Sequence, residues 1–143
     1  MNKYYCAPFR TREVCESGLK MKKTILIVDD DKSSCNSIAR ALEDDYQIYT
    51  ASSGVDAMNI LKKNTEIEIV LSDIMMGDMS GIDLLEKIHI INKKTIVIMI
   101  TGVTDAEPAI QARHLGAHDY IPKPLDLERL EVSIKSAIEK AGN

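Results

Sequence analysis

Short apolar runs alternate five times with segments of helical spacing, and this alternation constrains the fold more than any other feature of the sequence. The segments between the runs repeat apolar residues every three or four positions, as amphipathic helices do. The runs lie near residues 24–28, 47–50, 67–71, 95–100 and 118–121. Two of them, at 25–28 and 96–100, are apolar throughout, which is typical of strands covered by helices on both faces of a parallel sheet. The sequence therefore predicts a doubly wound α/β fold.

Residues that start and end helices fall between these segments. We expect helix starts or ends at Ser80, Asp126, Gly116, a capping box of Thr104 with Glu107, and Pro108 in a first helical turn. Ser33, Ser34 and Ser37 are interpreted in the same way, as residues of a helix start.

The length of 143 residues fits one domain, because a single hydrophobic core is typically built from roughly 100 to 150 residues. We expect this domain over residues 22–141. Residues 1–20 show no apolar period and are mildly basic, so we expect a flexible tail, with a docking arm as the alternative. Met21 is a candidate for the natural first residue.

Composition excludes several classes of function. With 22 acidic and 18 basic side chains, the net charge of -4 gives no electrostatic reason to expect nucleic-acid or membrane-surface binding. No apolar stretch approaches the ~20 residues of a transmembrane helix, and the N-terminus lacks the apolar region of a secretory signal. We therefore expect a cytoplasmic protein that acts on a small molecule or a protein partner. Cys6, Cys15 and Cys35 are odd in number and irregularly spaced, which indicates reduced thiols.

Polar residues follow four of the predicted strands. These strand ends carry Asp29-Asp30-Asp31, Ser72-Asp73, Thr101-Gly102 and Lys123-Pro124. The carboxyl ends of parallel strands meet at one edge of an open sheet, which is where ligands bind. Carboxylates gathered there repel one another unless a hard cation neutralises them, and an oxygen-only ligand set favours Mg²⁺ over zinc.

Thr101 and Lys123 indicate what this edge binds besides a metal. A hydroxyl and an ammonium can share the charge on the peripheral oxygens of a phosphoryl group while a carboxylate attacks in line. Asp73 follows the central strand of the set and is best placed to attack. The residues thus predict a carboxylate that accepts a phosphoryl group.

These motifs, in this order and spacing, resemble those of response-regulator receiver domains of two-component signalling. The likeness covers about residues 22–141, and the stretches that carry it are 25–31, 71–81, 100–102 and 116–124. The resemblance implies a flavodoxin-like (βα)5 fold with a five-stranded parallel sheet. It also implies that the phosphoryl donor is a sensor histidine kinase or a phosphotransfer protein.

The resemblance assigns a role to each motif residue. Asp73 is the expected phosphoacceptor, Thr101 and Lys123 hold the phosphoryl oxygens, and Thr101 with Tyr120 forms the switch. The implied Mg²⁺ set consists of Asp30, Asp73 and the backbone carbonyl of Met75, with Asp29 orienting metal-bound water. The small Gly102 leaves the phosphoryl group free to reach Thr101, and Lys123-Pro124 matches a lysine before a cis proline. The surface expected to respond is that of the fourth helix, fifth strand and fifth helix.

One position departs from the family pattern. Gly77 stands where the family usually has proline after the motif methionine, so we expect a more flexible loop after Asp73. We interpret Met75, Met76 and Met79 as packing residues, not as soft metal ligands. The apolar Met75 and Val103 suggest slow hydrolysis of the phosphorylated form. The three histidines, His89, His114 and His118, are expected at the surface.

Two rival functions remain open. A magnesium-dependent aspartyl phosphatase of the haloacid-dehalogenase type would use the same strand ends, but it carries a second aspartate where this chain has Met75. A receiver-like docking module that takes no phosphate is the other rival, and the complete set of motif residues speaks against it. We expect a single-domain response regulator, a switch that catalyses only its own phosphorylation and slow dephosphorylation. Its output is expected to pass through an unknown protein partner or through a phosphorylation-dependent homodimer.

Overall fold

The computed structural model describes residues 22–102 and 106–142 as five strands alternating with five helices. The tail at 1–20, Met21, Val103 and Thr104 of the expected capping box lie outside these described residues. In chain order the elements are β1 (Thr24–Val28), α1 (Lys32–Leu42), β2 (Gln47–Ala51), α2 (Gly54–Lys63), β3 (Ile69–Ser72), α3 (Gly81–Ile91), β4 (Ile96–Thr101), α4 (Ala106–His114), β5 (Asp119–Pro122) and α5 (Leu127–Gly142).

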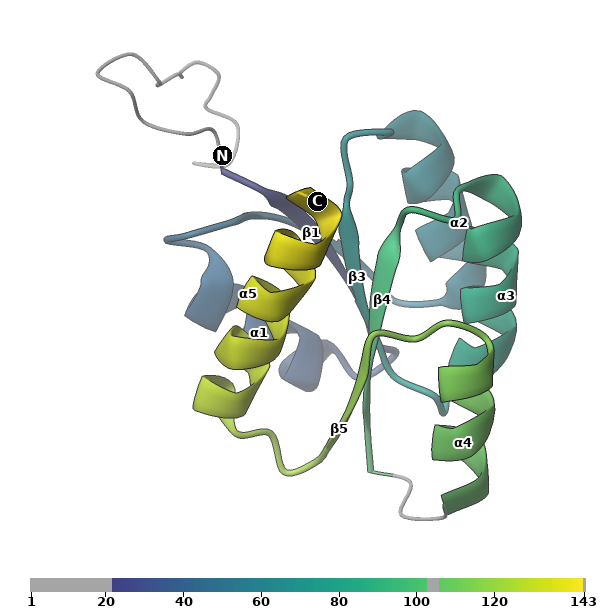
Figure 1. Cartoon of the computed structure of the whole chain (residues 1–143). Helices are drawn as coiled ribbons and strands as arrows, with labels where there is room; N and C mark the ends of the chain where they lie inside the picture. Colours follow the sequence, from purple (N-terminus) through teal and green to yellow (C-terminus); the bar gives the residue numbers. More distant parts are fainter. Residues whose placement is uncertain (1–21, 103–105, 143) are drawn as a thin grey trace.

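The strands form one parallel sheet in the order β2-β1-β3-β4-β5. Helices α1 and α5 pack on one face of the sheet, and α2, α3 and α4 pack on the other (Figure 1). The predicted doubly wound α/β fold of five βα units is therefore confirmed.

The apolar runs are continuous because alternate residues of each inner strand face different cores. In β1, Ile25 and Ile27 join the core under α1 and α5, whereas Leu26 and Val28 join the core under α2, α3 and α4. All four side chains are at most 1% exposed. A strand buried on both faces has no polar side, so the sequence shows a run instead of an alternation.

Several helix ends are as predicted. Ser80 caps α3 by accepting a hydrogen bond from the Asp83 N–H at 3.1 Å, and Asp126 accepts one from the Glu128 N–H at 3.0 Å. Gly116 has φ +99° and ends α4 with the paired backbone bonds of a Schellman motif. Pro108 lies in the first turn of α4.

The expectation for the start of α1 was wrong in detail. Asp31 is the N-cap, and its side chain accepts a hydrogen bond from the Ser33 N–H at 3.0 Å. Ser37 lies inside the helix, not at its start. An aspartate was available one residue before the helix, and Asp caps at least as well as Ser.

The strand order reverses between β1 and β3, and this reversal positions the candidate site. Val28 pairs with Ser72 at the carboxyl ends of the two strands, so Asp29 and Asp73 leave the sheet side by side. Crevices at such reversals are where open α/β sheets bind ligands. No helix in the described part of the chain is long and apolar enough to cross a membrane.

Candidate functional site

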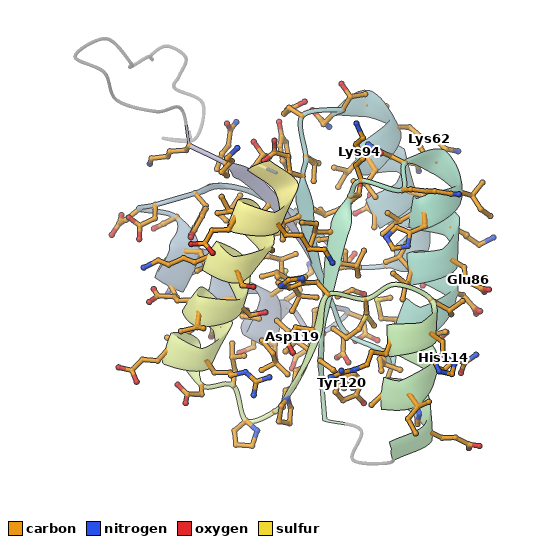
Figure 2. All side chains as sticks on the ribbon, in the orientation of Figure 1. Lys62, Glu86, Lys94, His114, Asp119 and Tyr120 are labelled. Atoms are coloured by element: carbon orange, nitrogen blue, oxygen red, sulfur yellow. The ribbon has the colours of Figure 1, made fainter. Side chains whose placement is uncertain are left out.

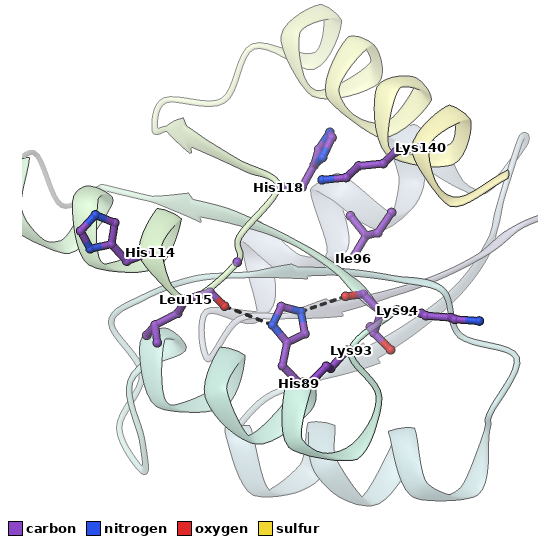
Figure 3. Close-up of a pocket in the computed structure, with 10 residues that line it drawn as sticks. His89, Lys93, Lys94, Ile96, His114, Leu115, His118 and Lys140 are labelled. Atoms are coloured by element: carbon purple, nitrogen blue, oxygen red, sulfur yellow. Dashed lines mark hydrogen bonds between the residues drawn. The ribbon is translucent and has the colours of Figure 1, made fainter. Parts of the chain in front are cut away.

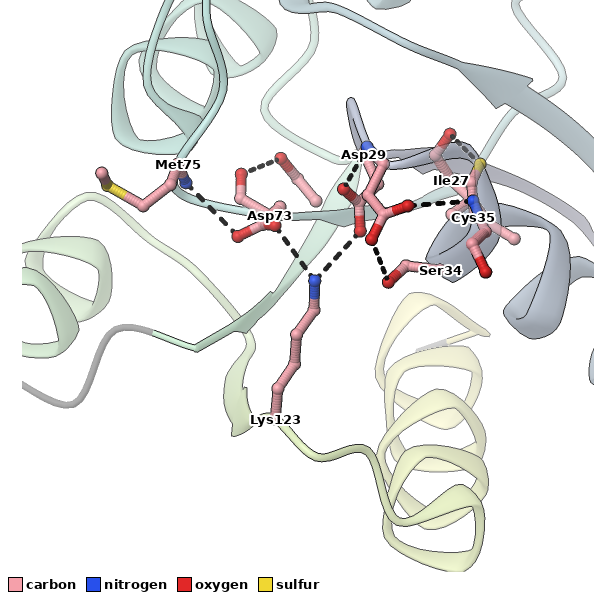
Figure 4. A network of polar contacts seen from close by, with 10 residues as sticks. Ile27, Asp29, Ser34, Cys35, Asp73, Met75 and Lys123 are labelled. Carbon is pink, nitrogen blue, oxygen red and sulfur yellow. Dashed lines mark hydrogen bonds and ion pairs between the residues drawn. The ribbon is translucent and has the colours of Figure 1, made fainter.

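Lys123 joins two carboxylates at the carboxyl edge of the sheet. Its Nζ lies 3.1 Å from Asp29 Oδ2 and 3.1 Å from Asp73 Oδ2 (Figure 4). The three residues come from the ends of β1, β3 and β5, which are up to 94 positions apart in the sequence. The structure thus brings together three of the residues that strand-end reasoning selected.

Backbone hydrogen bonds fix each of these residues to a neighbouring strand. The Asp29 N–H donates to Ala51 of β2 at 3.1 Å, and the Asp73 N–H donates to Val28 of β1 at 3.0 Å. The Lys123 N–H donates to the Thr101 carbonyl of β4 at 2.9 Å. The polar ends are therefore held by the same ladder that forms the sheet, which keeps their spacing rigid.

The site is largely withdrawn from water. Asp29 is 3% exposed and Asp73 is 9% exposed, while Lys123 reaches them from the rim with its side chain 27% exposed. Burial lowers the pKa of Lys123, but hydrogen bonds and charge attraction from Asp29 and Asp73 outweigh this effect and raise the pKa above its ordinary value of 10.5. Lys123 is therefore a cation at neutral pH.

Cys35 lies under the same edge, on α1. Burial, and secondarily the charge of Asp29, raise the pKa of its thiol to about 11. The Sγ–H faces the Ile27 carbonyl at 3.9 Å. Cys35 is a protonated, buried thiol, consistent with the expectation of a reduced cysteine.

The three consecutive aspartates have different surroundings. Asp29 is buried and accepts a hydrogen bond from the Asp31 N–H at 2.9 Å through Oδ1, whereas Asp31 caps α1. Asp30 is exposed. Only Asp29 contacts Lys123, so the sequence run DDD is one buried acid followed by one exposed acid and one helix cap.

This edge suits a hard divalent cation by its charge and chemistry. Asp29 and Asp73 carry two negative charges against the single positive charge of Lys123, and the adjacent Asp30 adds a third carboxylate. The described residues contain no group of three or more His, Cys, Asp or Glu side chains placed to hold a metal ion. The Mg²⁺ ligand set of Asp29, Asp30, Asp73 and the Met75 carbonyl therefore stays a prediction; Mg²⁺ typically binds through one or two carboxylates and several waters.

The expected switch residues lie on the two strands beside the site. Thr101 is fully buried at the end of β4. Tyr120 is half-buried, pairs with Met99 across the sheet and packs against the core under α2, α3 and α4 (Figure 2). The Lys123-Pro124 peptide bond is cis, as predicted. A Cβ at Gly102 would meet no described atom within 4 Å.

The loop between β3 and α3 is tied to the start of α2. Asp78 Oδ1 accepts from the Gly54 N–H at 3.1 Å, and its Oδ2 accepts from the Val55 N–H at 2.9 Å. These backbone hydrogen bonds lower the pKa of Asp78. Met79 packs so closely on Gly54 that a Cβ there would collide with the Met79 side chain. Gly77 therefore lies in a loop with anchors that the sequence reading did not anticipate.

Two residue interpretations need correction. Met75 is 66% exposed and is not a packing residue, although Met76 and Met79 do pack against the core under α2, α3 and α4. His89 is not at the surface: it is half-buried, and both ring nitrogens face carbonyl oxygens. Sequence spacing could not separate the three methionines, because all follow the same strand within five residues of one another.

Gly81 is a further residue of the site whose role the sequence reading missed. A Cβ at this position would collide with the Asp73 carbonyl oxygen and approach the Met99 side chain and Ile74 Cα. The Gly81 N–H also donates to the Ile74 carbonyl at 2.8 Å. The start of α3 can therefore lie directly against the backbone of Asp73. The signal was present as a glycine immediately after the N-cap Ser80.

Comparison with known proteins identifies the family. The profile of the response regulator receiver domain matches residues 25–135. The chain is 34% identical over 121 residues to the transcriptional regulatory protein ZraR of Salmonella typhimurium, which covers 84% of this chain and 27% of that protein. It is 31% identical over 116 residues to the regulatory protein AtoC of Escherichia coli, and the match covers 80% of this chain and 25% of that protein. The chain thus spans about a quarter of the length of these curated relatives.

Solved structures of receiver domains are similar to this chain in fold and sequence. A receiver domain from Clostridium thermocellum is similar with a TM-score of 0.79 and 34% identity, covering 82% of this chain and 94% of that one. A CheY-like receiver domain from Methanospirillum hungatei JF-1 is similar with a TM-score of 0.81 and 31% identity, covering 85% and 98%. The chain belongs to the response regulator receiver domain family, whose members are signalling switches of two-component systems.

Proposed function

We propose that this receiver domain accepts a phosphoryl group on Asp73 in a Mg²⁺-dependent reaction and then changes a partner-binding surface. The observation that carries the proposal is the contact of Lys123 Nζ with both Asp29 and Asp73 at 3.1 Å, at the strand-order reversal of the sheet. This arrangement combines a nucleophilic carboxylate with a fixed cation that can stabilise the charge of a transferring phosphoryl group.

The proposed donor is a phosphohistidine on a sensor kinase or a phosphotransfer protein. An oxygen of the Asp73 carboxylate attacks phosphorus, the phosphorus–nitrogen bond breaks, and its electron pair stays on the imidazole nitrogen of the donor. The product is an acyl phosphate on Asp73. Asp73 keeps 9% of its surface exposed and the neighbouring Met75 is 66% exposed, so a protein donor can approach the site.

Mg²⁺ would supply charge neutralisation for the carboxylates and the phosphoryl oxygens. Asp29, Asp30, Asp73 and the backbone carbonyl of Met75 are the groups that would hold it. Lys123 would remain the protein's own cation at the site, because its raised pKa keeps it charged at neutral pH.

The switch would run from Thr101 to Tyr120 and outward to α4, β5 and α5. Large apolar side chains on these helices are exposed and support a role in partner binding: Ile110 on α4, and Leu127 and Val132 on α5. The partner is proposed to be a protein or a second copy of the domain. We assign the receiver domain to residues 22–141 and place it in the cytoplasm, where ATP-dependent kinases act.

Intact-protein mass spectrometry tests the proposal. The chain is incubated with acetyl phosphate or phosphoramidate, with and without Mg²⁺, in parallel with Asp73→Asn and a control receiver domain. We expect one phosphoryl adduct that requires Mg²⁺ and is absent from the variant. If the control receiver is labelled and this chain is not, the proposal fails and the docking-module function gains support.

The same experiment separates the switch from an aspartyl phosphatase. Such an enzyme needs a general acid and base two residues after its nucleophile, where this chain has the exposed, apolar Met75. We therefore expect a lasting adduct and slow consumption of the donor. Rapid consumption without an adduct would favour the phosphatase.

A further inference from the structure

A pocket of about 730 Å³ lies at the edge of the sheet opposite Asp73. It is bordered by the residues that precede β4 and β5 and by the ends of α3, α4 and α5 (Figure 3). Small-molecule sites are typically concave and about 300–1,000 Å³ in volume, so this hollow has the size of such a site.

The lining of this pocket is basic. Lys93, Lys94 and Lys140 border it together with His114 and His118, and no acidic residue is among the lining residues. Lys93 and Lys94 come from the loop after α3, whereas Lys140 comes from the last turn of α5, so segments distant in the sequence contribute lysines to the lining. This concentration contrasts with the net charge of -4 of the whole chain.

His89 forms a rigid wall of the pocket. Its Nδ1 lies 3.1 Å from the Leu115 carbonyl oxygen and its Nε2 lies 3.0 Å from the Thr95 carbonyl oxygen. Gly116 permits this packing, because a Cβ there would lie 3.0 Å from His89 Cε1. His89 therefore joins α3 to the residue before β4 and to the loop before β5.

The histidines and lysines that line the pocket do not form a metal site. Both nitrogens of His89 are occupied by carbonyl contacts, and the part of the chain that the structure describes has no metal-holding group of three His, Cys, Asp or Glu side chains. The lysines are also more than is needed to neutralise the partial negative charge of the helix C-termini at this edge. Three helix C-termini carry together about −1.5 charges, whereas the three lysines alone carry +3.

We propose that this pocket binds a small molecule carrying two or more phosphate groups. The spread of its lysines over two segments suits an anion charged at more than one place. Lysine binds anions as a point charge, and a phosphate group carries close to two negative charges where a carboxylate carries one, so phosphate is the better match. Ile96 adds apolar surface to the lining, against which an organic part could lie. The inference does not depend on phosphorylation of Asp73.

Isothermal titration calorimetry of the full chain with tripolyphosphate, at low salt and without Mg²⁺, tests the proposal. We expect saturable binding to one site, weakened about tenfold, or about 1.4 kcal/mol, in Lys93→Ser/Lys94→Ser, because this variant removes two solvent-exposed ion pairs that each contribute modestly. The matched control is Lys62→Ser/Lys63→Ser, an adjacent exposed pair at the end of α2 that removes the same charge and does not line the pocket. Lys62 and Lys94 lie at the same end of the molecule (Figure 2).

The control variant distinguishes binding in the pocket from general attraction of the anion to surface lysines. We expect its affinity for tripolyphosphate to stay within twofold of that of the unsubstituted chain. Equal weakening of both double variants, or the absence of saturable binding, would overturn the proposal.

Amide NMR shifts should change at His118 and Lys94; changes confined to Asp29 and Lys123 would place the anion at the other edge and also overturn the proposal. ADP, pyrophosphate and citrate are titrated in the same way. ADP binding at least as tightly as pyrophosphate supports an organic ligand of the proposed class, and citrate binding as tightly as tripolyphosphate refutes the preference for phosphate.

Discussion

Lys123→Gln removes the cation shared by Asp29 and Asp73, and its cost can be worked out from the geometry. At 3.1 Å and an effective dielectric constant of about 20, each pair attracts by roughly 5 kcal/mol. Desolvation of the charges and repulsion between the carboxylates offset most of this, and breaking a buried pair by removing one partner typically costs about 3–5 kcal/mol. The Lys123 side chain is 27% exposed, so solvent screening reduces the expected loss to about 2–3 kcal/mol of unfolding free energy at pH 7.

The pH dependence of this loss has a defined sign. The folded-state pKa of Lys123 is raised above 10.5, so its stabilisation is fully present below pH 10.5 and is lost only as the pH rises through the folded-state value. The difference in stability between the unsubstituted chain and Lys123→Gln should therefore be the same at pH 7 and pH 9. It should shrink only above pH 10.5.

Urea unfolding followed by far-ultraviolet circular dichroism measures this difference, since the chain contains no tryptophan. Lys135→Gln is the matched control, because it removes the same charge from an exposed position of α5. A loss below about 0.5 kcal/mol for Lys123→Gln, or one equal to that of the control, would refute the reasoning, since surface substitutions usually stay within that range.

Three further predictions concern the surroundings of the site. Gly81→Ala should cost about 1–3 kcal/mol by overpacking and should slow labelling of Asp73 by acetyl phosphate, because the added Cβ collides with the Asp73 carbonyl oxygen. Gly77→Ala is the control, because a Cβ there meets nothing within 4 Å, and it should change neither urea unfolding nor labelling. Equal effects of Gly77→Ala and Gly81→Ala would contradict the argument. Asp78→Ala should speed amide hydrogen exchange at Gly54 and Val55, which lose their acceptor; unchanged exchange would show that the loop is held by other contacts. With Cys6 and Cys15 replaced by serine, the thiol of Cys35 should react with Ellman's reagent at pH 8 slowly in the native chain and fast in urea, since its pKa of about 11 and its burial suppress the thiolate; equally fast reaction would refute that environment.

The fold was predictable because burial on both faces leaves a periodic trace in the sequence. Ile25 to Val28 are all apolar because the two cores each take alternate side chains of β1. The predicted strand bounds were less accurate than the strand positions. The apolar run begins at Ile67, but β3 begins at Ile69, because Ile67 is buried without belonging to the strand. Burial alone does not reveal where a hydrogen-bonded ladder starts.

The approach of Asp29, Asp73 and Lys123 was also predictable, since strand ends of a parallel sheet share one edge. The neighbourhood of Asp78 and His89 was not. Asp78 binds N–H groups 23 and 24 positions earlier in the chain, and His89 contacts a carbonyl 26 positions later. Such contacts depend on how α2, α3 and α4 lie against one another, and one sequence contains no periodic signal for them.

One backbone hydrogen bond gives the proposed switch a direction. The Lys123 N–H donates to the Thr101 carbonyl, so the residue that pairs with Asp73 and the residue that ends β4 belong to the same stretch of ladder. A phosphoryl group on Asp73 that attracts the Lys123 ammonium and the Thr101 hydroxyl would act on both members of this bonded pair. The core beneath is close-packed and cannot absorb such a movement in empty space. Tyr120 lies on β5, three residues before Lys123, and packs on the face covered by α2, α3 and α4, so the movement should reach α4 before it reaches α1 on the opposite face.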